Sequence, residues 1–348
     1  EEQMKRLKTL QNENKEKKDQ FVIAYLNNLD YTDSCIEHAV QIANILNKGL
    51  ILIHIYDEQL TSIGVEKAEI KLKELNSKIP DTQLHSYISL KGNSKEIIGK
   101  LGQLLNAVII VTSCNTNEKQ KNKADNPSVL LKNMENSRTA YLICNQKESI
   151  VDYKKVLLTL NNARESKEKT LWASYFARFF GSEVTLFYHT YKDSFYQKQL
   201  NLNLAFARKM LGQFSIIPSN HKSEDRKTLL DLQALNYADK ENYGVIICQT
   251  TKDKSFFDKI KGLEEVKVLK ELNDKAILFL NQRGYSKTVI CTECGHVQKC
   301  ESCDVSLTYH KEDESLLCHY CGAKYKMIDA CTECGSPYIR YGGTGTER

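Results

Sequence analysis

Eight of the twelve cysteines in this 348-residue chain lie between residues 291 and 334, arranged as CTEC, CESC, CHYC and CTEC. A tight turn with two residues inside each pair points both sulfurs at one ion, and four cysteines complete a tetrahedral zinc site. Disulfides are not expected in a reducing cytoplasm. The spacing therefore predicts two Zn²⁺ ions and eight thiolate ligands: Cys291, Cys294, Cys300, Cys303, Cys318, Cys321, Cys331 and Cys334.

Spacing alone does not fix which pairs share an ion. Between the second and third pairs, DVSLTYHKEDESLL has the pattern of a strand, a charged turn and a returning strand. Such a hairpin would bring these two pairs together. The inner site would then comprise Cys300, Cys303, Cys318 and Cys321, and the outer site Cys291, Cys294, Cys331 and Cys334.

The other cysteines and the nearby histidines are not predicted to bind metal. Four cysteines stand singly in mostly apolar surroundings, as small buried hydrophobic residues do: Cys35, Cys114, Cys144 and Cys248. Three histidines near the pairs are expected to hydrogen-bond around the sites or to lie at the surface: His296, His310 and His319. No residue is assigned a catalytic role.

Upstream of these pairs, short β-branched runs alternate with longer helical stretches, which is typical of βαβ units and a parallel sheet. We expect strands near 21–26, 50–56, 84–88, 107–113 and 139–144, then near 155–160, 183–188, 213–217, 244–249 and 275–281. Helices are expected near 32–47, 62–78, 94–105 and 126–135, then near 165–180, 193–211, 225–238 and 262–273.

The two sets of elements form an internal repeat, since FVIAYLNN aligns with KVLLTLNN and NAVIIVTS with YGVIICQT. Each repeat predicts a five-strand parallel sheet covered by helices on both faces. The fold class is therefore α/β, with two doubly wound domains and a small C-terminal double zinc module. The expected organisation is a charged leader at 1–20, repeats at 21–148 and 153–281, and the zinc region at 282–348.

The repeats resemble universal stress protein domains at FVIAYLNNLDYTDSCIEHAVQIANILNKGLILIHIYD and KKVLLTLNNARESKEKTLWASYFARFFGSEVTLFYHTY. The resemblance implies a doubly wound fold and a homodimer. One subclass of that family binds ATP through an acid after the first strand and a glycine-rich loop after the fourth. Asn27 and Asn161 stand near the acid's position, and neither loop contains paired glycines, so ATP binding is not expected.

The last part of the chain resembles the zinc-binding region of the PriA family of primosomal helicases. FLNQRGY leads into the four cysteine pairs, CDVSLTYHK lies among them and GTGTER follows. The resemblance implies one zinc ion in each of the inner and outer sites and a role in replication restart. It also implies primosome proteins or forked or single-stranded DNA as partners.

No G-x-x-x-x-G-K-[ST] loop or other helicase motor motif occurs, so helicase or ATPase activity is expected only within a longer protein. Residues 283–348 carry eight basic and nine acidic side chains, which favours protein contact or strand separation over electrostatic clamping of duplex DNA. Whether the chain is a natural fusion, a chimera or a truncation stays open.

Composition and the length of the apolar runs indicate where the protein is located. The formal charge is +5, and the longest apolar runs fall short of the roughly 20 residues of a membrane helix. The first twenty residues lack the apolar stretch of a signal peptide, so we expect a cytoplasmic protein without membrane association.

Three functions are compatible with the sequence. The first is a non-catalytic PriA-like zinc module on a stress-protein scaffold. The second is a tandem universal stress protein whose zinc tail is structural or dimerising. The third is a piece of an ATP-dependent replication-restart helicase.

Overall fold

The computed structural model divides the chain into two compact units, Glu1–Gln282 and Arg283–Arg348, here called the α/β unit and the cysteine-rich unit. The expected leader lies outside the described residues, except for Gln20. The structure describes residues 20–56, 61–80, 84–115, 126–134, 137, 139–146, 152–163, 166–224, 228–249, 264–280, 289–294, 296–301, 307–310, 314–318 and 323–341.

The α/β unit alternates strands and helices twice, as the repeat predicts. The first repeat contains β1 (Phe21–Tyr25), α2 (Asp33–Leu46), β2 (Gly49–Tyr56), α3 (Ser62–Ser77), β3 (His85–Lys91), α4 (Ser94–Leu104), β4 (Ala107–Cys114), α5 (Pro127–Met134) and β5 (Ala140–Asn145). The second contains β6 (Lys155–Thr159), α6 (Ser166–Phe180), β7 (Glu183–Tyr188), α7 (Ser194–Gly212), β8 (Ser219–Lys222), α8 (Leu230–Glu241), β9 (Val245–Gln249), α10 (Glu264–Lys270) and β10 (Ala276–Leu280).

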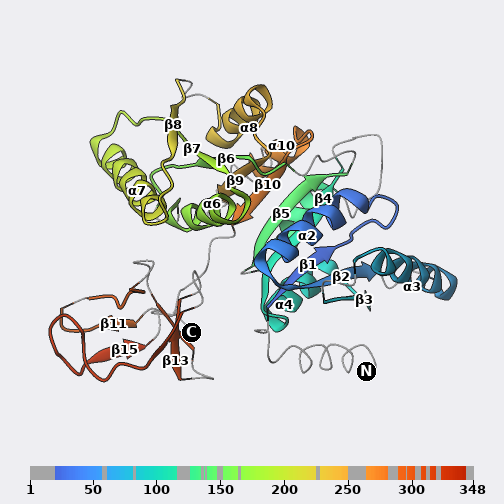
Figure 1. Ribbon diagram of the computed structural model, residues 1–348, viewed down its shortest axis with the longest axis horizontal. Coiled ribbons are helices and arrows are strands. Elements are labelled where there is room, and N and C mark those ends of the chain that lie inside the picture. The colour runs from blue at the N-terminus through green and yellow to red at the C-terminus, as the bar shows by residue number, and fades with distance from the viewer. Residues whose placement is uncertain are drawn as a thin grey trace. The chain divides into compact units, whose positions relative to one another are not determined.

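The two repeats share one ten-stranded sheet, whereas the sequence predicts two separate sheets. The strand order is β3-β2-β1-β4-β5-β10-β9-β6-β7-β8. Strands within each repeat are parallel, and β5 and β10 join the repeats in antiparallel fashion, with Leu278 opposite Leu142. Figure 1 shows β5 in green beside β10 in orange. Pairing these two strands protects the backbone groups that each would otherwise expose at a sheet edge.

Apolar side chains alternate between the two faces of this sheet and make two buried cores. On β1, Val22 and Ala24 join the core under α2, α3, α6 and α7. Phe21 and Ile23 on the same strand join the core under α4, α5, α8 and α10. Each helix layer therefore contains helices from both repeats, so the repeats are packed as one body.

The strand expected at 213–217 is wrong, because β8 is formed by Ser219–Lys222 instead. Helix α7 ends at Gly212, and Ser215 adopts the left-handed conformation with φ 60°. Pro218 follows, and Ile217 is 94% exposed. The apolar pair Ile216–Ile217 thus lies in the connection, and a polar segment makes this edge strand.

The cysteine-rich unit consists of two small antiparallel sheets among its described residues. Strand β11 (Val289–Cys291) pairs with β15 (Ile339–Tyr341). Strands β12 (Thr308–His310), β13 (Ser315–Leu317) and β14 (Lys324–Lys326) form a meander. The pairing of β12 with β13 is the predicted hairpin, and it packs around a small core that includes Leu307 and Leu316.

No helix in the part of the chain that the structure describes is both long enough and apolar enough to cross a membrane.

Candidate metal centre

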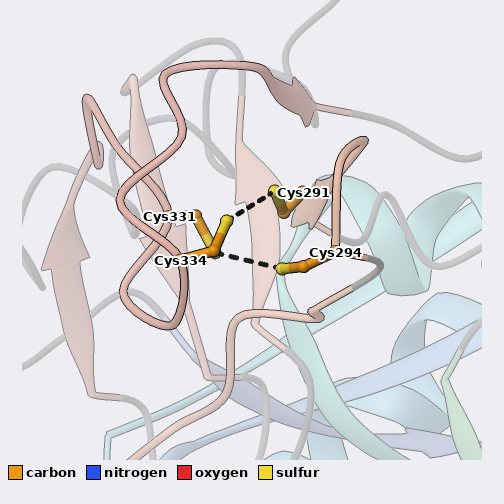
Figure 2. Close-up of side chains that lie close together, drawn as sticks. All are labelled: Cys291, Cys294, Cys331 and Cys334. Atoms are coloured by element: carbon orange, nitrogen blue, oxygen red, sulfur yellow. Dashed lines mark hydrogen bonds between the residues drawn. The ribbon is translucent and has the colours of Figure 1, made fainter.

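Four cysteines from two distant turns meet in the cysteine-rich unit. Cys291 ends β11 and Cys294 lies in the turn after it, whereas Cys331 and Cys334 lie in the turn that precedes β15. All four sulfurs lie within 4.8 Å of one another. Figure 2 shows the side chains converging from the two turns. The structure thus brings together the four residues of the predicted outer site.

Two of the sulfur–sulfur separations are close to those of a tetrahedral zinc site. Cys291 Sγ lies 3.6 Å from Cys334 Sγ, and Cys294 Sγ lies 3.7 Å from Cys331 Sγ. Zinc–sulfur bonds of about 2.3 Å in a tetrahedron place the sulfurs roughly 3.8 Å apart. A disulfide would need about 2.05 Å. The donor set and its spacing therefore fit one Zn²⁺ ion.

The two turns have the same backbone closure. The amide N–H of Cys291 donates to the carbonyl of His296 at 2.9 Å, and that of Cys331 donates to the carbonyl of Ser336 at 2.8 Å. Each bond runs from the first cysteine of a pair to the fifth residue after it. Gly335 has φ 72°, a left-handed conformation that glycine adopts readily. Both turns are thus held in the form that presents two sulfurs to one point.

Pairing between β11 and β15 holds these turns beside each other. Cys291 is opposite Ile339 in this ladder. The N–H of Thr292 also donates to the carbonyl of Tyr338 at 3.0 Å, and its hydroxyl donates to the same carbonyl at 3.1 Å. The relative position of the two cysteine pairs is therefore set by backbone contacts of the chain itself.

Two of the thiols, Cys291 and Cys334, differ in acidity because their sulfurs have different neighbours. The backbone N–H of Cys294 donates toward Cys291 Sγ, with a further contribution from Glu293, and lowers the pKa of Cys291 to about 7. The N–H of Ser336 lowers the pKa of Cys334, but the neighbouring sulfurs of the cluster outweigh it and raise this pKa to about 12. Four thiolates this close repel one another, and a divalent cation offsets that repulsion.

Two cysteines of the predicted inner site lie in the small core of the unit. Cys300 and Cys318 are buried and pack in one cluster with Val289, Leu307 and Leu316. The N–H of Cys318 donates to the carbonyl of Ala323 at 2.9 Å, which repeats the closure seen at Cys291 and Cys331. Cys303 and Cys321 lie outside the described residues.

Besides the histidines, three residues make polar contacts around the cysteines that the sequence did not indicate: Gln298, Tyr325 and Thr332. The Tyr325 hydroxyl lies 3.2 Å from Cys300 Sγ and accepts a hydrogen bond from the N–H of Glu301 at 3.2 Å. The Thr332 hydroxyl donates to Gln298 Oε1 at 2.9 Å, which links the two outer turns. None of these residues has a spacing signal, because each acts through the folded hairpin or turn.

The histidines near the cysteine pairs and the four single cysteines were not predicted to bind metal. His296 Nε2 lies 3.4 Å from the Thr332 hydroxyl, and His296 Nδ1 lies 4.0 Å from a Glu333 carboxylate oxygen. The side chain of His310 and all of His319 lie outside the described residues. The four single cysteines are buried in the α/β unit: Cys35, Cys114, Cys144 and Cys248.

The cysteine-rich part of the chain is similar to one group of known proteins. A family model described as the PriA DNA helicase Cys-rich region (CRR) domain matches residues 300–326. Replication restart protein PriA of Bacillus subtilis is 33% identical over 144 residues, 41% of this chain and 17% of that protein. The same-named protein of Borreliella burgdorferi is 45% identical over 76 residues, 21% of this chain and 12% of that protein. The chain thus spans less than a fifth of either relative.

The α/β unit matches a different group of proteins. The crystal structure of a universal stress protein from Archaeoglobus fulgidus aligns with a TM-score of 0.60 and 15% identity, covering 76% of this chain and 98% of that one. This similarity concerns the fold alone. The chain therefore combines a universal stress protein-like fold over about three quarters of its length with a PriA-like Cys-rich zinc-ribbon region.

Proposed function

We propose that residues 283–348 form a two-zinc module that acts in replication restart, and that the α/β unit is the scaffold carrying it. The observation that carries this proposal is the convergence of four sulfurs from two turns, within 4.8 Å of one another, in a unit that contains the PriA-like match. Structural zinc in such a site stabilises a small unit whose apolar core is limited.

The second zinc ion would be held by Cys300, Cys303, Cys318 and Cys321. The PriA-like match at 300–326 spans all four of these positions. The hairpin between β12 and β13 joins the two pairs, and the backbone closure at Cys318 is the one found at both outer turns. These features support an inner site of the same chemistry as the outer one.

The partner proposed for this module is forked or single-stranded DNA, with primosome proteins as a further partner. Residues 283–348 have a formal charge of −1, so counterion release contributes little to binding. Tyr338 is 65% exposed, and its carbonyl is fixed by two hydrogen bonds from Thr292. An exposed ring on a fixed backbone can stack on an unpaired base.

Fluorescence anisotropy with a labelled forked DNA and a matched duplex tests this role on the zinc-loaded full chain. We expect preferential binding of the fork, weakened about fivefold or more by Tyr338→Ala, since stacking contributes roughly 1–3 kcal/mol per base. Tyr31→Ala is the matched control, because Tyr31 is 43% exposed in the α/β unit. Failure to bind either forked DNA or primosome proteins would contradict the proposal.

A second candidate is a tandem stress protein whose zinc tail is structural or dimerising. The continuous ten-stranded sheet favours it, since this unit forms most of the chain. Because β5 already pairs with β10, edge-to-edge association of two chains would use β3 or β8. Loss of a dimer in the Cys291→Ser/Cys331→Ser variant, measured by light scattering and without DNA binding by the parent chain, would support this candidate.

ATP-dependent DNA unwinding is proposed only for a longer protein that also carries motor motifs. The relatives named replication restart protein PriA are matched over 17% and 12% of their lengths, and these 348 residues contain no Walker A loop.

A further inference from the structure

Helix α7 in the second repeat exposes apolar side chains on the side that faces away from its sheet. Phe195 is 63% exposed and Leu202 is 50% exposed. These two residues are seven positions apart, so they lie on one face of the helix, two turns from each other. The opposite face buries residues such as Leu200 and Leu204 in the core. Packing within the α/β unit therefore does not account for Phe195 and Leu202.

Cationic side chains lie on the same face. Lys198 and Lys209 are exposed and continue the helical spacing of Phe195 and Leu202. Neither lysine forms an ion pair with any residue in the described part of the chain. Residues 194–223 contain four lysines and arginines and no aspartate or glutamate. These four residues, here called the α7 face, therefore form a cationic and apolar surface about 21 Å long.

The aromatic rings at the start of this face are supported by the fold. The ring centroids of Phe195 and Tyr196 are 5.7 Å apart, and those of Tyr196 and Tyr191 are 6.1 Å apart. The N–H of Tyr191 donates to Gln197 Oε1 at 2.8 Å, and its hydroxyl accepts the N–H of Asn162 at 3.4 Å. Tyr191 is thus anchored, whereas Phe195 and Tyr196 are open to solvent.

Asp193, the acidic residue just before α7, fixes the turn that carries these rings. Its carboxylate accepts the N–H groups of Phe195 at 2.8 Å and of Tyr196 at 3.1 Å. This carboxylate caps the helix, and its charge is offset by the positive end of the helix dipole. The two exposed rings therefore sit on a backbone that loses little freedom when a ligand contacts them.

We propose that the α7 face binds a single-stranded nucleic acid. Unpaired bases stack on Phe195 and Tyr196, and Lys198 and Lys209 contact phosphates along the strand. Stacking requires exposed rings, and phosphate contact requires cations that are not already paired, and the α7 face offers both. The inference rests on the proposed function for its class of partner, but the contact lies in the α/β unit and does not involve Tyr338.

An anionic membrane surface fits this face less well. An interfacial helix needs a continuous apolar stripe that can enter the lipid. Here Lys198 and Gln199 stand between Phe195 and Leu202, so the apolar residues are separated along the helix. Separated rings and cations suit alternating bases and phosphates better than lipid.

Fluorescence anisotropy of the zinc-loaded full chain with a labelled oligothymidylate of about 15 nucleotides tests the stacking contact. We expect Phe195→Ala to weaken binding about fivefold or more. Ile63→Ala is the matched control, since Ile63 is 64% exposed on α3, and it should leave the affinity unchanged. An equal loss in both variants would overturn the role of the ring.

Salt dependence of the same binding tests the phosphate contacts. We expect Lys198→Gln/Lys209→Gln to make the slope of log affinity against log salt concentration shallower by about 1.4, because each phosphate contact on a single strand contributes roughly 0.7. Lys67→Gln/Lys73→Gln removes the same charge from exposed positions on α3 and should leave this slope unchanged. Equal slopes in the two double variants would show attraction by net charge alone and would overturn the site.

Tyr338→Ala separates this inference from the proposed function. If Phe195→Ala weakens oligothymidylate binding, the α7 face is supported, whether or not Tyr338→Ala also weakens it. Loss in Tyr338→Ala with full affinity in Phe195→Ala would overturn the α7 site and leave the proposed function standing. No binding by the parent chain would overturn the inference, as would binding to phosphatidylglycerol vesicles alone.

Discussion

At the residue scale, the cysteines differ in the hydrogen-bonding groups that surround their sulfurs. Cys291 Sγ accepts backbone N–H groups that lower its pKa to about 7, whereas Cys300 has a tyrosine hydroxyl 3.2 Å from its sulfur. A hydroxyl that donates to a ligand sulfur orients it and reduces its charge. The Tyr325 hydroxyl also accepts the N–H of Glu301, so it fixes the chain just after Cys300.

Removing that hydroxyl should affect one zinc ion only. We expect Tyr325→Phe to lower zinc retention at the inner site roughly tenfold or more, because loss of a group that contacts a ligand typically costs 10–100-fold in metal affinity. Competition with a chromophoric chelator measures this for each of the two ions. Tyr338→Phe is the control, since Tyr338 is exposed. Equal zinc loss from both variants would contradict the role given to Tyr325.

His38 should make the stability of the α/β unit depend on pH. It is buried and hydrogen-bonded to Tyr153, and burial lowers its pKa from 6.5 to about 4. Below pH 6.5 the His38 side chain binds a proton in the unfolded chain but remains neutral in the native state. The free energy of unfolding is therefore highest above pH 6.5 and falls by about 3 kcal/mol in total as the pH is lowered to 4.

Urea unfolding at pH 7 and pH 5 tests this dependence. The His38→Gln variant keeps a hydrogen-bonding group for Tyr153 but does not titrate, so it should lose less stability on acidification than the parent chain. His85→Gln on edge strand β3 serves as the control. Identical pH dependence in the parent and His38→Gln would show that His38 does not cause it.

The paired spacing of the cysteines, together with the hairpin predicted between the second and third pairs, was sufficient to identify the four residues of the outer cluster. The same reasoning could not find Tyr325, Thr332 or Gln298, whose contacts depend on strand register and turn geometry. It also could not find the α7 face. Apolar residues at helical spacing are usually core residues, and only the fold shows that Phe195 and Leu202 are exposed.

At the scale of elements, periodicity predicted helices and most strands to within a few residues. It failed where an element's position depends on its neighbour. β8 is a polar edge strand whose Ser219 hydroxyl meets that of Thr185 at 2.6 Å, whereas the more apolar Ile216–Ile217 lies outside the sheet. Pairing of β5 with β10 was also missed, since each repeat has by itself a complete five-strand pattern.

The β5–β10 junction should couple the two repeats. Leu278 is fully buried and lies between Leu142 of β5 and Ile247 of β9. We expect Leu278→Ala to lower the free energy of unfolding by about 2–5 kcal/mol. Hydrogen exchange should then increase in both β5 and β9.

The exposed Ile217 offers a matched control for that substitution. It is 94% exposed, so Ile217→Ala should change stability by no more than about 0.5 kcal/mol. Faster exchange in β9 with unchanged exchange in β5 would contradict coupling through the shared sheet.

At the scale of the whole molecule, the two units are stabilised by different interactions. The α/β unit is stabilised by two cores, one on each face of its sheet. The described core of the cysteine-rich unit is small, with five buried members that include Cys300 and Cys318. Metal binding contributes on the order of 10 kcal/mol in comparable small domains. Only the second unit should therefore depend on zinc.

Chelation should unfold one unit and spare the other. After treatment with a strong zinc chelator, we expect hydrogen exchange to become fast throughout β11–β15 and to stay unchanged in β1–β10. Adding zinc back under reducing conditions should restore protection, since the ligands are thiolates. Protection of the cysteine-rich unit that survives complete zinc removal would show that its fold does not need the metal.

Native mass spectrometry of the full chain tests whether the eight clustered cysteines hold two zinc ions. We expect two zinc ions per parent chain. We expect one ion in Cys331→Ser/Cys334→Ser, one in Cys300→Ser/Cys318→Ser, and two in the control Cys114→Ala, whose thiol is buried in the α/β unit. A parent chain with no zinc or with a single ion, or loss of zinc in the control, would contradict the binding of two zinc ions by these cysteines.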